Sequence, residues 1–319
     1  MIALAPKELA GVESSNSTHL GFSDESSWNQ NRYRSIGLVT APRDIVDAAT
    51  AKCNSLLEES GVREFAWKRL TDAKHKFAAL KIVDQVVEFS RLGQLRIDVL
   101  IWDTHDARHQ IQGRDDTANL ARMYYHLMAN VMRDRWFPHA IWILNVDERT
   151  DMDWKELEEC LAGRTRKERE GAQARLIRIA TTDKRPPTVC QASSGEHTLI
   201  QVADLFAGLG AFSWNATQSH REWVTRQSGQ LRLMPQCTDV SVSKSASPKH
   251  AVLERLASSR LPDVSLNTAD GEGLRTYRPS HPINFWKYTP QGGFDKAPRR
   301  NESCPPSPKP TSKPPPLSG

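Results

Sequence analysis

Apolar residues recur along the chain with two spacings, and the alternation between them predicts the secondary structure. Continuous apolar runs are typical of buried strands, and apolar positions three or four residues apart are typical of helices. The predicted strands are a hairpin over residues 19–40, a short strand at 63–70, and strands at 95–104, 139–146 and 175–181. The predicted helices cover residues 43–60, 72–92, 117–136, 153–174 and 200–215. A leading hairpin followed by alternating helices and strands predicts an α/β fold, a mixed sheet flanked by helices.

The pattern weakens after residue 215. Residues 219–228 and 249–260 favour helices, and residues 279–288 favour an extended closing segment. Pro, Ser and Lys dominate from about residue 290, a composition without a core to fold against. The predicted organisation is a flexible lead at 1–17, an α/β domain at 18–214, a less regular C-terminal extension at 215–289 and a disordered tail at 290–319.

Composition narrows the class of protein. The chain has no apolar run of about 18 residues or more, so no membrane partner is expected, and its N-terminus lacks the pattern of a signal peptide. Five cysteines without C-x-x-C spacing fit a reducing cytoplasm better than a disulfide framework or a zinc ribbon. The net charge of +5, part of it from the tail, permits a nucleic-acid partner. Nothing in the sequence indicates an oligomeric state.

Acidic residues follow three of the predicted strands: Asp24 with Glu25, then Asp103, then Asp147. The strand ends of α/β sheets form ligand crevices, and several carboxylates there suit a hard divalent cation such as Mg²⁺ or Mn²⁺. Asp24 and Asp103 converge if their strands lie side by side and parallel. For Asp147, a loop or helix-capping role explains the acid equally well. Two neighbouring histidines, His105 and His109, offer a competing zinc or manganese site in a polar loop.

The predicted helix at 200–215 is apolar except for one carboxylate, Asp204. Burying an ionised carboxylate is costly unless a cation or hydrogen-bond donors meet it. Gln201, Asp204 and Gly208 share one helical face, and the small residue is expected to let the helix lie close to the sheet. Asp204 is therefore expected to complete the acidic group at the strand ends.

Four short motifs, FSDES, EFAWKRL, ILNVDE and IQVADLFAG, make residues 18–214 resemble the domain of unknown function 3800 family of bacterial and phage proteins. The resemblance implies a ribonuclease H-like fold and carries the family's acidic pair onto Asp24 and Glu25, and its later strand acid onto Asp147. It also carries the last helix motif onto Gln201, Asp204 and Gly208. The third-strand motif matches at Glu64 and Trp67, but Ala66 stands where the family has lysine, with Lys68 next along.

Two functions follow from these residues. The first is a metal-dependent nuclease or phosphoryl-transfer enzyme in which Asp24, Glu25, Asp103 and Asp204 are catalytic and Asp24, Asp103, Asp147 and Asp204 hold Mg²⁺ or Mn²⁺. Supporting roles fall to Glu64, Lys68, Gln201 and Gly208, and the phosphate backbone is expected to meet Arg32, Arg34, Lys68 and Lys184. The second is a non-catalytic binding or regulatory module, in which Lys68 or an arginine neutralises Asp204.

Overall fold

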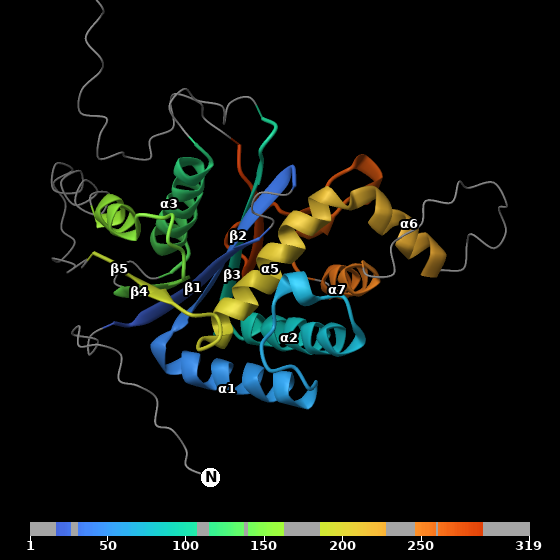
Figure 1. Cartoon of the computed structure of the whole chain (residues 1–319), viewed down its shortest axis with the longest axis horizontal. Helices are drawn as coiled ribbons and strands as arrows, with labels where there is room; N and C mark the ends of the chain where they lie inside the picture. Colours follow the sequence, from blue (N-terminus) through green and yellow to red (C-terminus); the bar gives the residue numbers. More distant parts are fainter. Residues whose placement is uncertain are drawn as a thin grey trace, which may run out of the picture.

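A six-stranded mixed sheet runs through the centre of the protein (Figure 1). The computed structural model describes residues 17–26, 31–106, 115–136, 140–162, 186–227, 246–259 and 261–289. The strands of the sheet are β1 (His19–Ser26), β2 (Tyr33–Pro42), β3 (Arg96–Asp103), β4 (Trp142–Asp147), β5 (Thr188–Ala192) and β8 (Ile283–Lys287). They lie in the order β5-β4-β1-β2-β3-β8. β2 is antiparallel to both of its neighbours and the other pairs are parallel, so the predicted opening hairpin and mixed α/β sheet are confirmed.

Helices cover both faces of this sheet. One face carries α1 (Arg43–Glu59), α2 (Ala73–Arg91), α5 (Thr198–Asn215) and α7 (Ser247–Ala257), and the other carries α3 (Asp116–Asp134) and a helix at 154–162. We call these the α5 face and the α3 face. Residues of β2 alternate between them, with Val39 in the α5-face core and Leu38 in the α3-face core. Because both faces are covered, the central strands β2 and β3 are buried along most of their length.

The helix α5 lies directly against β2, and glycine in the strand makes this possible. A Cβ atom on Gly37 would lie 2.4 Å from the carbonyl oxygen of Ala203, so the two backbones touch. One helical turn after Ala203, the hydroxyl of Ser35 donates to the carbonyl of Ala207 at 2.6 Å. This hydrogen bond also holds α5 close to β2. Gly208, in contrast, faces the ring of Trp67, which a Cβ would meet at 2.2 Å. The expectation that Gly208 lets the helix approach the sheet is therefore wrong.

Three other local expectations differ from the structure. Residues 63–70 form a loop with a 3-10 turn, η2 (Trp67–Arg69), and not a strand, because their amide groups bond to side chains of α5. Helix α3 begins at Asp116 and not at residue 117, and its N-cap is Asp115, whose carboxylate accepts from the Ala118 N–H at 2.7 Å. The sequence pattern did not anticipate β5. The strand predicted at 175–181 lies outside the described residues, as does most of the helix predicted at 153–174.

The C-terminal extension belongs to the same core as the rest of the protein. It contributes α6 (Thr217–Gln227), α7, the short hairpin of β6 (Val264–Leu266) and β7 (Leu274–Thr276), the 3-10 turn η5 (Thr268–Asp270), and β8. β8 pairs with β3 in parallel and covers a strand edge that would otherwise be open. Leu253 and Phe285 are fully buried in the α5-face core. None of the described helices combines the length and the apolar character needed to cross a membrane.

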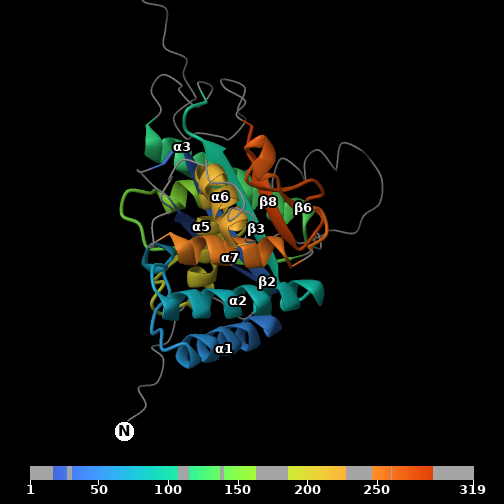
Figure 2. The same cartoon turned by 90° about the vertical axis from the view of Figure 1, so that its right-hand side faces the viewer.

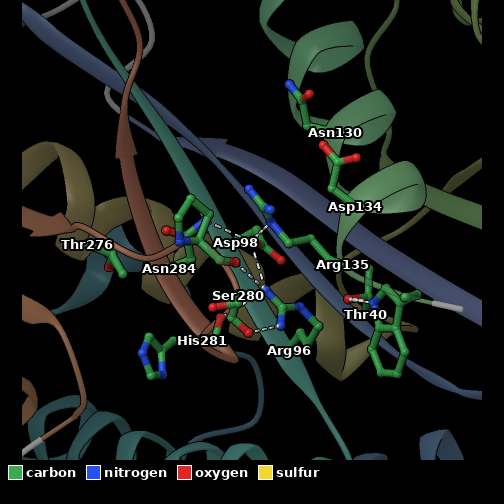
Figure 3. Close-up of polar contacts among 12 residues, drawn as sticks. Thr40, Arg96, Asp98, Asn130, Asp134, Arg135, Thr276, Ser280, His281 and Asn284 are labelled. Atoms are coloured by element: carbon green, nitrogen blue, oxygen red, sulfur yellow. Dashed lines mark hydrogen bonds and ion pairs between the residues drawn. The ribbon is translucent and has the colours of Figure 1, made fainter.

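A buried polar network fastens β8 to the sheet. Asp98 on β3 is 1% exposed and accepts from the Asn284 side chain at 3.0 Å, and the guanidinium of Arg96 lies 3.4 Å away. Arg135, which follows α3, approaches the same carboxylate at 4.0 Å. Figure 3 shows these side chains pointing toward one another from β3, β8 and the end of α3. Arg96 also donates to the carbonyls of residues 279, 280 and 281, and so orders the turn that leads into β8.

Replacing Arg96 by leucine is expected to lower the free energy of unfolding by about 3 kcal/mol or more, because Asp98 keeps a buried charge while losing a cation. Urea denaturation measures this loss. Arg275→Leu is the matched control, since Arg275 is exposed and its ion pair with Glu272, at 3.6 Å, is worth less than about 1 kcal/mol. Equal effects of the two substitutions would show that the network does not hold β8.

Candidate functional site

Two acids at the ends of β1 and β4 face the same side of the sheet. Phe22 packs in the α5-face core, so Asp24, two residues on, points to the same face. Val146 packs on the α3 face, so Asp147 points to the α5 face as well. β1 and β4 are parallel, with Ser23 beside Val146, and Asp24 is therefore level with Asp147 on the neighbouring strand. Neighbouring strands lie about 5 Å apart.

Asp204 joins this pair from α5, and the loop at η2 holds its carboxylate. The backbone N–H of Trp67 donates to the Asp204 carboxylate at 2.6 Å. The Trp67 ring lies against the bare backbone of Gly208, one turn further along the same helical face. Gly208 thus gives Trp67 the room it needs to turn its amide toward Asp204.

Gln201 connects the loops around the acids. Its side-chain oxygen accepts from the Phe65 N–H at 2.8 Å, and its side-chain nitrogen donates to the Ser194 carbonyl at 2.7 Å. The Ser194 N–H in turn donates to the Asp147 carboxylate at 3.2 Å. The predicted supporting residue Gln201 therefore lies between the η2 loop, which holds Asp204, and the β5–α5 loop, which holds Asp147.

Burial raises the pKa of each of the three acids, and for Asp24 and Asp204 the charges of neighbouring acids add to the effect. Burial raises the pKa of Asp24 well above its usual range, and the charges of Asp204, Glu25 and Asp147 add to this effect. Burial, with the charges of Asp147 and Glu25, raises the pKa of Asp204 to about 7, against the Trp67 hydrogen bond and the nearby charge of Lys68. Burial also raises the pKa of Asp147. We call Asp24, Asp147 and Asp204 the acid triplet.

No cationic side chain among the described residues forms an ion pair with Asp24 or Asp204. The carboxylate of Asp24 accepts only from the adjacent Glu25 N–H, at 2.7 Å, within that part of the chain. Neutralisation of Asp204 by Lys68 would need an ion pair, whereas Lys68 acts on the Asp204 pKa without forming one. The triplet thus has a surplus of negative charge.

Glu25 does not belong to the triplet. It points to the α3 face, where the Tyr124 hydroxyl donates to its carboxylate at 2.7 Å and Arg149 forms an ion pair with it. Burial, followed by the charge of Glu25, raises the pKa of Tyr124 well above its usual range. The structure thus gives Glu25 structural partners in place of the catalytic position predicted for it, because adjacent residues of a strand point to opposite faces.

Asp103 also lies apart from the triplet. β2 separates β3 from β1, so the condition under which Asp24 and Asp103 would converge is not met. Asp103 is paired in register with Tyr33, which packs on Trp214 near the far end of α5. Ten residues of helix separate Trp214 from Asp204, a length of about 15 Å. Partial burial acts to raise the pKa of Asp103, but hydrogen bonds from Arg32 and the His105 N–H hold it below its usual value.

The remaining predicted residues have other partners. Glu64 pairs with Arg69 across η2 at 3.2 Å, Arg32 pairs with Asp103, and Arg34 pairs with Asp116. Lys68 is exposed beside Asp204. His109 and Lys184 lie outside the described residues, so the histidine site stays untested.

The triplet offers oxygen ligands only, the donor type that Mg²⁺ and Mn²⁺ prefer. Within the described part of the chain, no three His, Cys, Asp or Glu side chains are already arranged to hold a metal ion. Surplus negative charge and donor chemistry therefore fit a divalent cation. The sequence pattern missed Ser194 and the half-buried Lys249, whose charge interacts with Asp204. Lys249 lies 45 residues after Asp204 in a segment without a motif.

The triplet predicts a specific pH dependence of stability in the absence of divalent metal. The pKa of Asp204 is raised from 3.8 to about 7, so the folded protein keeps a proton that the unfolded chain releases, and stability falls as the pH rises through this window. Asp204→Asn is expected to raise the free energy of unfolding at pH 8 by about 2 kcal/mol, and to have no effect below about pH 4. Urea denaturation in EDTA at several pH values measures this difference.

Asp103→Asn is the control with the opposite sign. The pKa of Asp103 is lowered, so its ionised form contributes stability above the usual carboxyl range, and that contribution is lost as the pH falls. Asp103→Asn is therefore expected to destabilise the protein at pH 8. A destabilising Asp204→Asn at pH 8 would contradict the charge surplus of the triplet.

Two known proteins match the chain over nearly all of its length, although no family model matches it. A protein of Methanothermobacter thermautotrophicus called uncharacterized protein ORF2' is 39% identical over 298 residues, which cover 90% of this chain and 99% of the relative. Uncharacterized protein ORF2 of the same organism is 36% identical over 301 residues, with the same coverage of both chains. The chain therefore belongs to the protein family that contains ORF2 and ORF2'.

Proposed function

We propose that the protein is a divalent-metal-dependent nuclease or related phosphoryl-transfer enzyme that acts on nucleic acid at the acid triplet. One observation carries this proposal: Asp24, Asp147 and Asp204 come together from three elements, and each has a raised pKa. Buried carboxylates that repel one another lower the stability of the folded protein, and such groups concentrate at functional sites.

In this proposal Asp24, Asp147 and Asp204 hold Mg²⁺ or Mn²⁺ through carboxylate oxygens. A divalent cation bound there would lower the pKa of an attacking water and stabilise the oxygen that leaves phosphorus. The protein's own part is to position the ligands. The Trp67 N–H fixes one oxygen of Asp204 and the Ser194 N–H fixes one oxygen of Asp147, so each acid keeps a second oxygen for the ion.

The same proposal includes a ribonuclease H-like core and membership of the domain of unknown function 3800 family. An opening hairpin, helix-linked parallel strands and a late helix that carries an acid all support it. The loop at η2 adds support, because two of the quoted motifs meet there: the Phe65 N–H donates to Gln201 and the Trp67 N–H donates to Asp204. A cytoplasmic location, expected from the scattered cysteines, belongs to the same proposal.

A second function, a non-catalytic binding or regulatory module, has one observation in its favour. The pKa of Asp204 near 7 allows its carboxyl to share a proton with a neighbouring acid, which removes much of the repulsion without any metal. In that case the triplet is a structural feature of the fold. Metal binding distinguishes the two functions.

Titration calorimetry with Mn²⁺ and Mg²⁺ tests the proposal. The wild type is expected to bind Mn²⁺, and Asp24→Asn and Asp204→Asn are each expected to weaken binding at least about tenfold, since each removes a charged ligand. Asp103→Asn is the matched control, because this acid is ion-paired with Arg32 away from the triplet.

Cleavage of labelled single-stranded and double-stranded DNA and RNA with Mn²⁺ then completes the test. Loss of cleavage in Asp24→Asn and Asp204→Asn, with Asp103→Asn active, supports a nuclease. Absence of metal binding by a folded wild type, or equal binding by all three variants, would leave the binding module as the better explanation.

A further inference from the structure

A lysine from the C-terminal extension reaches the acid triplet. α7 packs on α2 and α5, and Figure 2 shows it lying in front of α5 and above α2. This packing places the ammonium nitrogen of Lys249 5.0 Å from the centre of the Trp67 ring. The charge of Lys249 also interacts with that of Asp204. Trp67 therefore contacts both groups, with its ring under the lysine and its N–H on the carboxylate.

The Trp67 ring is itself held firmly. One side of the ring lies against Gly208, where a Cβ atom would have no room. The ring of Phe212 packs edge-on against it, with the two ring centres 5.7 Å apart. A cation over an aromatic face keeps its donors free, because the attraction comes from the ring electrons and uses no hydrogen bond. Lys249 is thus positioned without its N–H groups being taken up.

Lys249 and Lys68 differ from several arginines of this protein in having no ion pair among the described residues. Arg32, Arg69 and Arg149 are each paired with a carboxylate. Lys68, next to Trp67 in the chain, is exposed, and its charge also acts on Asp204. Two ammonium groups therefore flank the triplet from different elements, and both retain donors for an anionic ligand.

We propose that Lys249 and Lys68 form a phosphate-binding pair that holds the nucleic-acid backbone beside Asp204, with Trp67 as the positioning residue for Lys249. This inference rests on the proposed function, because it names how the same site takes its substrate. Three phosphate oxygens provide acceptors for both lysines, and lysine binds phosphate as a compact point charge. The C-terminal extension thereby contributes part of the substrate site.

Salt-dependent binding in EDTA tests the pair without any cleavage. The probes are fluorescein-labelled single strands of DNA and of RNA, each about 20 nucleotides long, and fluorescence anisotropy gives the affinity at several NaCl concentrations. Each phosphate contact contributes about 0.7 to the slope of log affinity against log salt for a single strand. Lys249→Ala and Lys68→Ala are each expected to reduce the slope by that amount, and Lys249→Arg to restore it.

Lys76→Ala is the matched control. Lys76 also lies over an aromatic ring, 5.3 Å from the centre of Phe77, but that ring is 55% exposed and on α2. Its removal is expected to leave the slope unchanged. An unchanged slope in a folded Lys249→Ala, or no binding of either probe by the wild type, overturns the phosphate-binding pair.

The test of the phosphate-binding pair and the test of the nuclease can fail independently of each other. Metal binding and cleavage that depend on Asp24 and Asp204, with a normal slope in Lys249→Ala, would refute the pair and leave the nuclease intact. A reduced slope without metal-dependent cleavage would support the pair and refute the nuclease. If Lys249 serves only to neutralise Asp204, Lys249→Ala destabilises the protein, Asp204→Asn reverses that loss, and the slope does not change. That result also overturns the pair.

Discussion

The backbones of α5 and β2 are in direct contact, and this contact sets the position of the helix that carries Asp204. Gly37 has no side chain, and Ala203 presents its carbonyl oxygen where a Cβ would stand. This contact places α5 against the middle of the sheet, along β1, β2 and β3. The position of α5 along the sheet and its rotation about its own axis then determine the direction in which the side chains of Gln201 and Asp204 point. They face away from the sheet centre, toward the η2 loop and the ends of β1 and β4.

The acid triplet is costly to the fold, and the surrounding loops reduce that cost only in part. Backbone N–H groups from Trp67 and Ser194 reach Asp204 and Asp147, but Asp24 has only its neighbour's amide among the described residues. Burial therefore raises the pKa of all three carboxyls, and nearby negative charges raise it further. By contrast, the acids at Glu25, Asp98 and Asp103 each lie within reach of an arginine. Buried carboxyls that lack the arginine partners of these three acids favour a ligand at the triplet.

The C-terminal extension completes the fold at two places. β8 closes the open edge of β3 and is fastened there by Arg96, Asp98 and Asn284. α7 covers α2 and α5 and carries Lys249 to the ring of Trp67. Removal of the chain after α5 would expose the apolar surface that Leu253 and Phe285 cover. It would also leave the edge of β3 without a partner strand. Folding and the proposed substrate site therefore depend on the same segment.

Local patterns in the amino-acid sequence were sufficient to predict most of the helices and strands and the most informative acids. Hydrophobic spacing predicted the hairpin, α1, α2, β3, α3, β4 and α5, because these elements bury apolar residues at regular intervals. An isolated carboxylate in an apolar helix pointed to Asp204. Only the tertiary structure decided which strands are neighbours and which face each acid occupies. Strand order separated Asp103 from Asp24, because pairing across the sheet depends on packing between distant segments and not on local pattern. The partners of Glu25 on the α3 face, Tyr124 and Arg149, likewise come from distant segments. Lys249 reached the site for the same reason.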